Sequence, residues 1–434
     1  MPSTEDLTSL EAREAARRIR DGGLSAVALV EAHLARIRAL EPEVHAWVHV
    51  DEQGALAAAR ERDATRGRDA GPLSGVPVGI KDIIDVRAMP TTAGADPVFH
   101  TRPADDAPAV ARLRRAGAII LGKTVTTEFA FRNPRATANP WNRAHTPGGS
   151  SSGSAAAVAS RMVPLALGSQ TVGSVLRPAA YCGVVGFKAA HGLVPTEGVV
   201  PLAWSLDHVG IFARSVDDAA TLISVLTERD LTPTAVTAPR LALAPDLLRR
   251  ATPETAEHVQ AMADRFAKAG AKVVEITLPE SFATIHAVGQ TILETEAGAF
   301  HEEHLKAHAA ELGADIRALA EAGRAVRAID YVRADRARRV FRAAMQQVLA
   351  AHDALISPTA PSTAPAGLGH TGDASLCAPW STTGVPAISL PSGVAPSGLP
   401  LAVQLVNVAG DSSRLLGIAA WCERVLGFTA RPGL

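Results

Sequence analysis

Short apolar runs alternate with helical patterns along most of this chain, and this alternation restricts the possible folds more than any other feature. Apolar runs rich in β-branched residues predict strands at 75–80, 118–121, 184–187, 240–244, 272–276, 353–357 and 401–406. Helical spacing predicts helices at 26–40, 107–116 and 411–426, with Ser25 and Asp411 as N-caps and Pro42 ending the first helix. Strands that alternate with helices form parallel or mixed sheets. We therefore predict an α/β fold whose central mixed β-sheet is covered on both faces by helices.

The 434 residues allow two or three domains, but no repeat or low-complexity linker divides the chain. Residues 1–70 are mainly helical in pattern, and strands alternate with helices over about 71–230 and 350–434. The region of about 235–350 is helical and charge-rich. We expect a single domain over 1–434, in which this region elaborates the β-containing core.

Charge excludes several classes of partner. The chain has 43 basic and 44 acidic residues, a formal net charge of −1, and no basic run. This balance argues against binding to nucleic acid or to an anionic membrane surface. No signal peptide is evident, and Arg161 and Pro164 interrupt the most apolar stretch, 155–168. We expect a cytoplasmic enzyme that has no nucleic-acid or membrane partner.

The cysteines and histidines do not predict a metal site. Cys182, Cys377 and Cys422 are far apart without a CxxC pair, so we expect buried reduced thiols rather than a disulfide scaffold or a zinc site. The three histidines of one helical segment are interpreted as part of a solvated charged face: His301, His304 and His308. His145 is interpreted as a loop or substrate-side residue.

Two glycine- and serine-rich loops are the most unusual segments. Residues 148–153 read GGSSSG and precede an alanine-rich helix, and residues 168–174 read GSQTVGS. Such loops cannot pack a core, but free N–H groups at a turn or helix N-terminus can bind a carbonyl oxygen. The N–H groups that could point at one oxygen are those of Thr171, Val172, Gly173 and Ser174. Ser174 is then a candidate nucleophile. The alternative for 148–153 is a flexible surface turn.

Lys81 is the candidate base for this serine. It follows the apolar run 75–80 directly, so its amine is expected to be partly buried. Burial lowers the pKa of an amine toward neutrality, and a general base needs such a pKa. The alternative, an ion pair between Lys81 and Asp82 at the surface, fits the pattern equally well.

Together, these segments resemble the amidase signature family. The segments are GIKD at 79–82, GGSSSG at 148–153 and GSQTVGS at 168–174, and the intervals match the family pattern: 150 − 81 = 69 and 174 − 150 = 24 residues. Family-like segments also occur at 123–129, 182–188, 384–393 and 398–404. The likeness spans roughly 60–425 and is weakest at 230–340.

The resemblance implies an amidase-signature fold and a Ser–cis-Ser–Lys triad. Ser174 would be the nucleophile, Lys81 the neutral base, and Ser150, on a cis peptide bond, the proton relay between them. The N–H groups of residues 171–174 would form the oxyanion hole. Loop support would come from Gly148, Gly149 and Ser151. The resemblance implies no cofactor and no metal.

The second loop departs from the common family pattern. Gln170 replaces the usual aspartate, Val172 replaces a glycine, and Leu176 stands at the usual arginine position, with Arg177 one residue later. The usual carboxylate–guanidinium pair therefore cannot form. Because both charges are lost together, no partner is left unpaired. We expect an intact triad, with Val172 adding bulk beside the oxyanion hole.

The resemblance implies a serine amidohydrolase that cleaves small neutral amides, anilides or carbamates, including urethanes, with esterase side activity. We expect a monomer or homodimer whose specificity comes from about 235–350 and from the loops of 358–400, where Arg, Trp380 and apolar residues suggest a hydrophobic or aryl pocket. Two alternatives remain: the glutaminase subunit of a tRNA-dependent amidotransferase, or a catalytically silent member that binds a carbonyl group.

Overall fold

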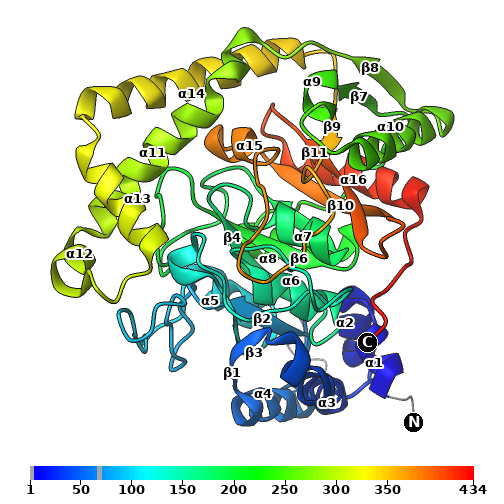
Figure 1. The fold of residues 1–434 in the computed structure, drawn as a ribbon. Coiled ribbons are helices and arrows are strands. Elements are labelled where there is room, and N and C mark those ends of the chain that lie inside the picture. Colours follow the sequence, from blue (N-terminus) through cyan, green and yellow to red (C-terminus); the bar gives the residue numbers. More distant parts are fainter. Residues whose placement is uncertain (1–3, 66–70) are drawn as a thin grey trace.

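Eleven strands form one continuous sheet in the computed structural model, which describes residues 4–65 and 71–434. Their spatial order is β1-β3-β2-β4-β6-β5-β10-β11-β9-β7-β8. The strands are β1 (Trp47–Val50), β2 (Pro77–Lys81), β3 (Ile119–Thr124), β4 (Leu165–Gln170), β5 (Val185–Lys188), β6 (His208–Ala213), β7 (Arg240–Leu243), β8 (Lys272–Glu275), β9 (Ala354–Pro358), β10 (Ala387–Val394) and β11 (Pro400–Val406). Figure 1 shows the sheet running from β1 to β8 through the molecule.

The sheet is mixed. β2 pairs in parallel with both β3 and β4, and β7 pairs in parallel with β8 and β9. The strands between these two parallel groups, from β4 through β6, β5, β10 and β11 to β9, pair antiparallel. The predicted fold class is confirmed.

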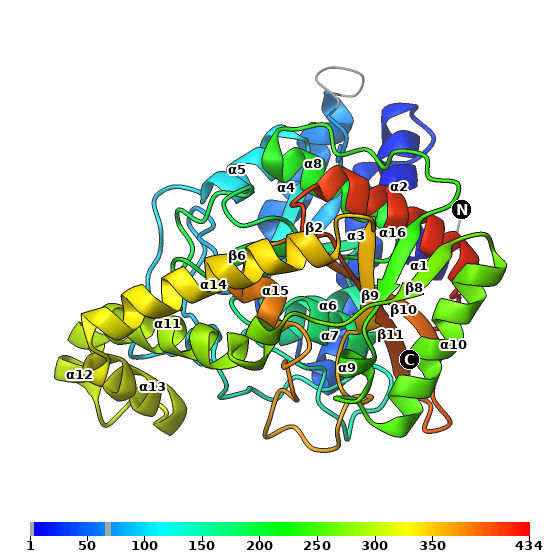
Figure 2. The ribbon, with the colours of Figure 1, turned by 90° about the horizontal axis from the view of Figure 1, so that it is seen from above.

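Helices cover both faces of the sheet (Figure 2). The α-helices are α1 (Thr4–Ser9), α2 (Ala12–Arg20), α3 (Ala26–Val44), α4 (Glu52–Ala64), α5 (Pro108–Arg115), α6 (Ser152–Ala159), α7 (Leu176–Cys182), α8 (Val216–Thr227), α9 (Pro245–Leu248), α10 (Pro253–Lys268), α11 (Ile285–Phe300), α12 (Glu302–His308), α13 (Ala314–Ala325), α14 (Ala328–Val348), α15 (Ala378–Thr382) and α16 (Ser412–Leu426). Side chains alternate along each strand, so neighbouring residues enter opposite cores. On β11, Leu405 packs in the core that holds α5, α8, α10 and α16, whereas Val406 packs against α14 and α15.

Helices α11 to α14 form a layer beside the sheet, in yellow-green to yellow in Figures 1 and 2. α11 packs against both α13 and α14. A small apolar core joins this layer to the segment after β5, through Leu202 and Leu206 against Leu293 of α11. No helix in the described chain is long and apolar enough to cross a membrane.

Several elements differ from the sequence prediction. β1 interrupts the part expected to be helical, β10 lies within the loops expected over 358–400, β6 had no predicted counterpart, and two boundaries lie elsewhere. The first long helix does not end before Pro42 but continues to Val44, because Val44 is buried and the Glu41 carboxylate accepts the N–H groups of Ala46 and Trp47 beyond its end. The segment expected to be a loop from residue 168 begins as strand, since 168–170 complete β4 between β2 and β6. Ser25 and Asp411 cap their helices as predicted.

Candidate active site

Lys81 ends β2 and is completely buried, with 0% of its surface exposed. The neighbouring Asp82 forms an ion pair with the buried Lys123, at 3.0 Å between Oδ1 and Nζ. Asp82 also accepts hydrogen bonds from the N–H and hydroxyl groups of Thr92. The alternative of a surface pair between Lys81 and Asp82 is therefore wrong, because Asp82 has a different, buried cation as its partner.

The Lys81 amine lies between two serine hydroxyls. Its Nζ donates to Ser150 Oγ at 2.7 Å and to Ser169 Oγ at 2.8 Å. Burial lowers the pKa of Lys81 well below its ordinary value, and the charge of Asp207 opposes that shift only in part. Such an amine is uncharged at lower pH than an exposed lysine, and in that form it can accept a proton. The sequence does not single out Ser169 as a site residue, because its pattern is the same as that of the other small residues of its loop.

The two glycine- and serine-rich loops are bonded to each other. Ser151 Oγ donates to the Ser169 carbonyl and accepts the Ser169 N–H, both at 3.2 Å. The Gly149–Ser150 peptide bond is cis, which is the geometry that the resemblance implied. Gly148 has a positive φ of 81°, and a Cβ there would approach the Pro178 backbone to 2.8 Å, so only glycine fits this turn. Residues 148–151 are buried rather than forming a flexible surface turn.

Ser174 lies just before α7 and lines a cavity of about 530 Å³. It is 7% exposed, and within the described chain its hydroxyl makes no hydrogen bond to another protein group, so Ser150 and Ser174 are not directly bonded here. The N–H groups of Thr171, Val172, Gly173 and Ser174 likewise meet no protein acceptor among the residues that the structure covers. Free donors beside a serine in a concave site can stabilise an oxyanion.

Gln170 and Arg177, two residues at which the second loop and its flank differ from the common family pattern, are both hydrogen-bonded to backbone groups. Gln170 Oε1 accepts the N–H groups of Val175 and Leu176 at 2.9 and 3.0 Å, at the start of α7. Arg177 donates to the carbonyl groups of Gly149 and Gly372, both at 2.6 Å. Gln170 thus uses a neutral amide to satisfy helix N–H groups, and Arg177 joins the peptide before Ser150 to a wall of the cavity.

Three segments form the rest of the cavity. α11 contributes His286, Gly289, Gln290 and Leu293, and the segment after β5 contributes Leu202 and Leu206. The third segment is the loop of residues 369–375 together with Ala378 and Thr382 of α15. Phe131, Arg132, Thr171, Val172, Arg177 and Asp315 also line it. Leu202, Leu206 and Leu293 give the cavity an apolar patch, whereas His286, Gln290 and residues 369–375 contribute polar side chains. A larger open hollow between α2, α5 and α8 contains none of the predicted site residues.

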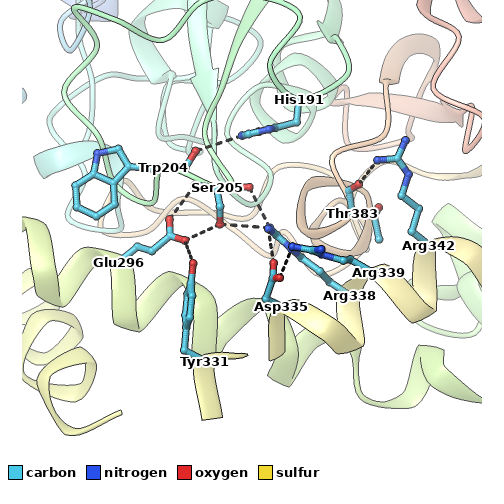
Figure 3. Close-up of polar contacts among 10 residues, drawn as sticks. All are labelled: His191, Trp204, Ser205, Glu296, Tyr331, Asp335, Arg338, Arg339, Arg342 and Thr383. Atoms are coloured by element: carbon cyan, nitrogen blue, oxygen red, sulfur yellow. Dashed lines mark hydrogen bonds and ion pairs between the residues drawn. The ribbon is translucent and has the colours of Figure 1, made fainter. Parts of the chain in front are cut away.

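A hydrogen-bond network holds the segment after β5 against α11 and α14 (Figure 3). Glu296 of α11 accepts the Ser205 N–H at 2.8 Å, the Ser205 hydroxyl at 2.6 Å and the Tyr331 hydroxyl at 2.8 Å. Arg338 of α14 donates to the Ser205 carbonyl at 3.1 Å and forms an ion pair with Asp335. Leu202 and Leu206, which line the cavity, lie on either side of Ser205 in the sequence. The hydrogen bonds of Ser205 therefore help to hold this wall of the cavity in place.

His301 and Trp380 lie elsewhere than the sequence suggested. His301 is not on a solvated face but is buried, with its ring 4.6 Å from that of Phe129. Trp380 does not line the cavity; it is buried against Phe341, because its position on α15 faces the core. His145 is a loop residue, one of the two expected placements; its ring is hydrogen-bonded to the Ala364 carbonyl and does not line the cavity.

The three cysteines are free and buried, and burial raises the pKa of each thiol. No group of three or more His, Cys, Asp or Glu side chains suited to a metal ion occurs in the part of the chain that is described. The groups that meet around Lys81 and Ser174 are hydroxyl groups, one amine and backbone N–H groups.

Comparison with known proteins extends the likeness over nearly the whole chain. The family model described as Amidase matches residues 28–416. A glutamyl-tRNA(Gln) amidotransferase subunit of Roseiflexus castenholzii is 35% identical over 98% of this chain and 97% of its own. A solved structure described as a crystal structure of amidase has a TM-score of 0.89 and 32% identity over 96% of this chain and 99% of its own. Native peptide amidase from Stenotrophomonas maltophilia has a TM-score of 0.84 and 29% identity over 98% of each chain.

Proposed function

This chain belongs to the Amidase family and is an amidohydrolase, and we propose that it acts through an acyl-enzyme on Ser174. The observation that best supports this proposal is the buried Lys81 amine, which donates to Ser150 Oγ at 2.7 Å beside a cavity lined by Ser174. An amine in such surroundings is neutral and basic enough to remove a proton through the intervening hydroxyl.

In the proposed mechanism, Ser174 Oγ attacks the carbonyl carbon while its proton passes to Ser150, whose own proton passes to Lys81. The negative charge on the carbonyl oxygen is stabilised by the free N–H groups of residues 171–174. The C–N bond then breaks, and the amine leaves with the proton returned through Ser150. Water hydrolyses the acyl-enzyme by the same relay. The Ser150–Ser174 contact forms when substrate binds, as catalytic hydrogen bonds often tighten in the complex.

The proposed substrates are small neutral amides, anilides or carbamates, with esters as a side activity. The size of the cavity, about 530 Å³, suits a small molecule, and its apolar patch offers contacts from Leu202, Leu206 and Leu293. Because α11 lies within residues 235–350, we also propose that this part of the single domain over 1–434 determines specificity. Monomer or homodimer remains the proposed assembly.

A second candidate is the glutaminase subunit of a tRNA-dependent amidotransferase. The amidotransferase relatives favour it over small amides, since their identity of up to 35% covers nearly the whole chain. In that case the substrate would be glutamine, and the chain would act in a complex with other subunits. The altered loop at Gln170 and Val172 supports the first candidate.

A substrate panel tests both candidates. Amides, anilides, carbamates, ureas, esters and glutamine are incubated with the wild type, with Ser174→Ala and with Ser412→Ala. Ser412 is a matched control, because its buried hydroxyl on α16 has no partner in the described chain and lies outside the cavity. We expect turnover and fluorophosphonate labelling to be lost only in Ser174→Ala. Preferred hydrolysis of glutamine would support the second candidate, and normal turnover by Ser174→Ala would refute the mechanism.

A further inference from the structure

Ser381 is a buried residue on α15 that contacts the second loop. It is 0% exposed and does not line the cavity. Its Oγ donates to the Val172 carbonyl at 2.7 Å and accepts a hydrogen bond from Gln170 Nε2 at 2.9 Å. The segment before it packs directly on the loop, since a Cβ at Gly173 would approach Ala374 Cβ to 2.7 Å.

The hydrogen bonds that join Gln170, Ser381 and the Val172 carbonyl can run in only one direction. Both N–H groups at the start of α7 donate to Gln170 Oε1, so the oxygen of the amide faces α7 and the NH₂ faces Ser381. Ser381 must then accept from Gln170, and its single hydrogen is available for the Val172 carbonyl. A carboxylate at position 170 would still accept the two N–H groups, but it would compete with Val172 for the Ser381 hydrogen.

The Val172 carbonyl and the Gly173 N–H belong to the same planar trans peptide, so they point in opposite directions. A bond that holds the carbonyl therefore also sets the direction of the N–H. Gly173 N–H has no protein acceptor within the described chain. We propose that Ser381, oriented by Gln170, is a positioning residue that aims the Gly173 N–H at the carbonyl oxygen of the substrate. This inference rests on the proposed function of Ser174.

The role predicts a specific kinetic pattern for Ser381→Ala and Gln170→Glu. Both variants release the Val172 carbonyl, and Gln170→Glu retains acceptors for α7. Loss of one oxyanion-hole donor lowers kcat about 10²- to 10³-fold, and a misaimed donor should cost roughly ten- to a hundredfold. We expect KM to change little, because the interaction strengthens only as the oxyanion forms. The affinity for phenylboronic acid, which forms a tetrahedral adduct with a serine, should fall with kcat.

Ser392→Ala is the matched control. Ser392 on β10 is also a buried serine that pairs with a side-chain nitrogen, His258 Nε2 at 2.8 Å, and donates to a backbone carbonyl, that of Leu401 at 3.2 Å. It lies outside the cavity. We expect this variant to lose similar stability but to keep wild-type kcat, boronate affinity and fluorophosphonate labelling rate.

The outcomes separate this inference from the proposed function. Parallel losses of kcat, boronate affinity and labelling rate in Ser381→Ala and Gln170→Glu, absent in Ser392→Ala, would support the positioning role. Unchanged kinetics in both site variants would overturn it, as would a loss that appears in KM alone or equally in Ser392→Ala. If Ser174→Ala still turns over substrate, the proposed function itself fails, whatever Ser381→Ala does.

Discussion

Replacement of Lys81 by methionine should change how the stability of the protein depends on pH. The Lys81 amine is fully buried, and burial lowers its pKa well below the ordinary value. Between that lowered pKa and the unfolded value near 10.4, the unfolded chain binds a proton that the folded chain does not. The free energy of unfolding of the wild type therefore rises with pH in this window and falls as the pH decreases.

The expected slope follows from linkage. One proton released on folding changes the free energy of unfolding by about 1.4 kcal/mol per pH unit, or about 2.7 kcal/mol over two units inside the window. Lys81→Met removes the titrating group and retains most of the side-chain volume. The free energy of unfolding of Lys81→Met, compared with that of the wild type, should therefore be most favourable at low pH. As the pH rises, the difference between the two free energies should change in favour of the wild type by about 1.4 kcal/mol per pH unit.

The measurement is urea unfolding of the wild type and Lys81→Met at several pH values below the ordinary lysine pKa of about 10.4. Lys268→Met serves as the control, because Lys268 is exposed at the end of α10. We expect the difference from the wild type to be constant with pH for Lys268→Met. A constant difference for Lys81→Met as well would show that the folded protein holds Lys81 charged, and would refute the argument for a neutral base.

Three further predictions concern the surroundings of the site. Lys123→Met should lower the free energy of unfolding by about 3–5 kcal/mol in urea titrations, because Asp82 stays buried without its cation; a loss below about 1 kcal/mol would contradict this. Val172→Gly should raise the ratio of kcat/KM for bulky acyl anilides to kcat/KM for small ones on the order of tenfold, because Val172 lines the cavity beside Ser174. An unchanged ratio would contradict this role of Val172. Arg177→Met should lower turnover. Arg214→Met removes a half-buried guanidinium that is also bonded to backbone carbonyls, and it should affect only thermal stability; equal turnover in both variants would disprove a role for Arg177 at the site.

The local pattern of the sequence was sufficient for the fold class and for the segments that meet at the site. Apolar runs and helix caps report on interactions within a few residues, so the strands at 75–80 and 401–406 and the caps Ser25 and Asp411 could be predicted. The two glycine- and serine-rich loops and Lys81 were found for the same reason. Residue types with special backbone freedom, or a charge beside an apolar run, stand out without any knowledge of distant contacts.

The partners of those residues depended on the tertiary structure. Whether Lys81 pairs with Asp82 could not be settled locally, because the competing cation, Lys123, comes from the neighbouring strand β3. Ser169 and Ser381 carry no distinguishing pattern, and they reach the site only because β4 ends beside β2 and α15 packs on the second loop. Local sequence patterns were enough to predict an α/β fold and a candidate site that contains serine and lysine. Only the packing of distant segments decided which hydroxyl, amide and carbonyl groups hold one another, since hydrogen bonds require positions within about 3 Å that no local pattern specifies.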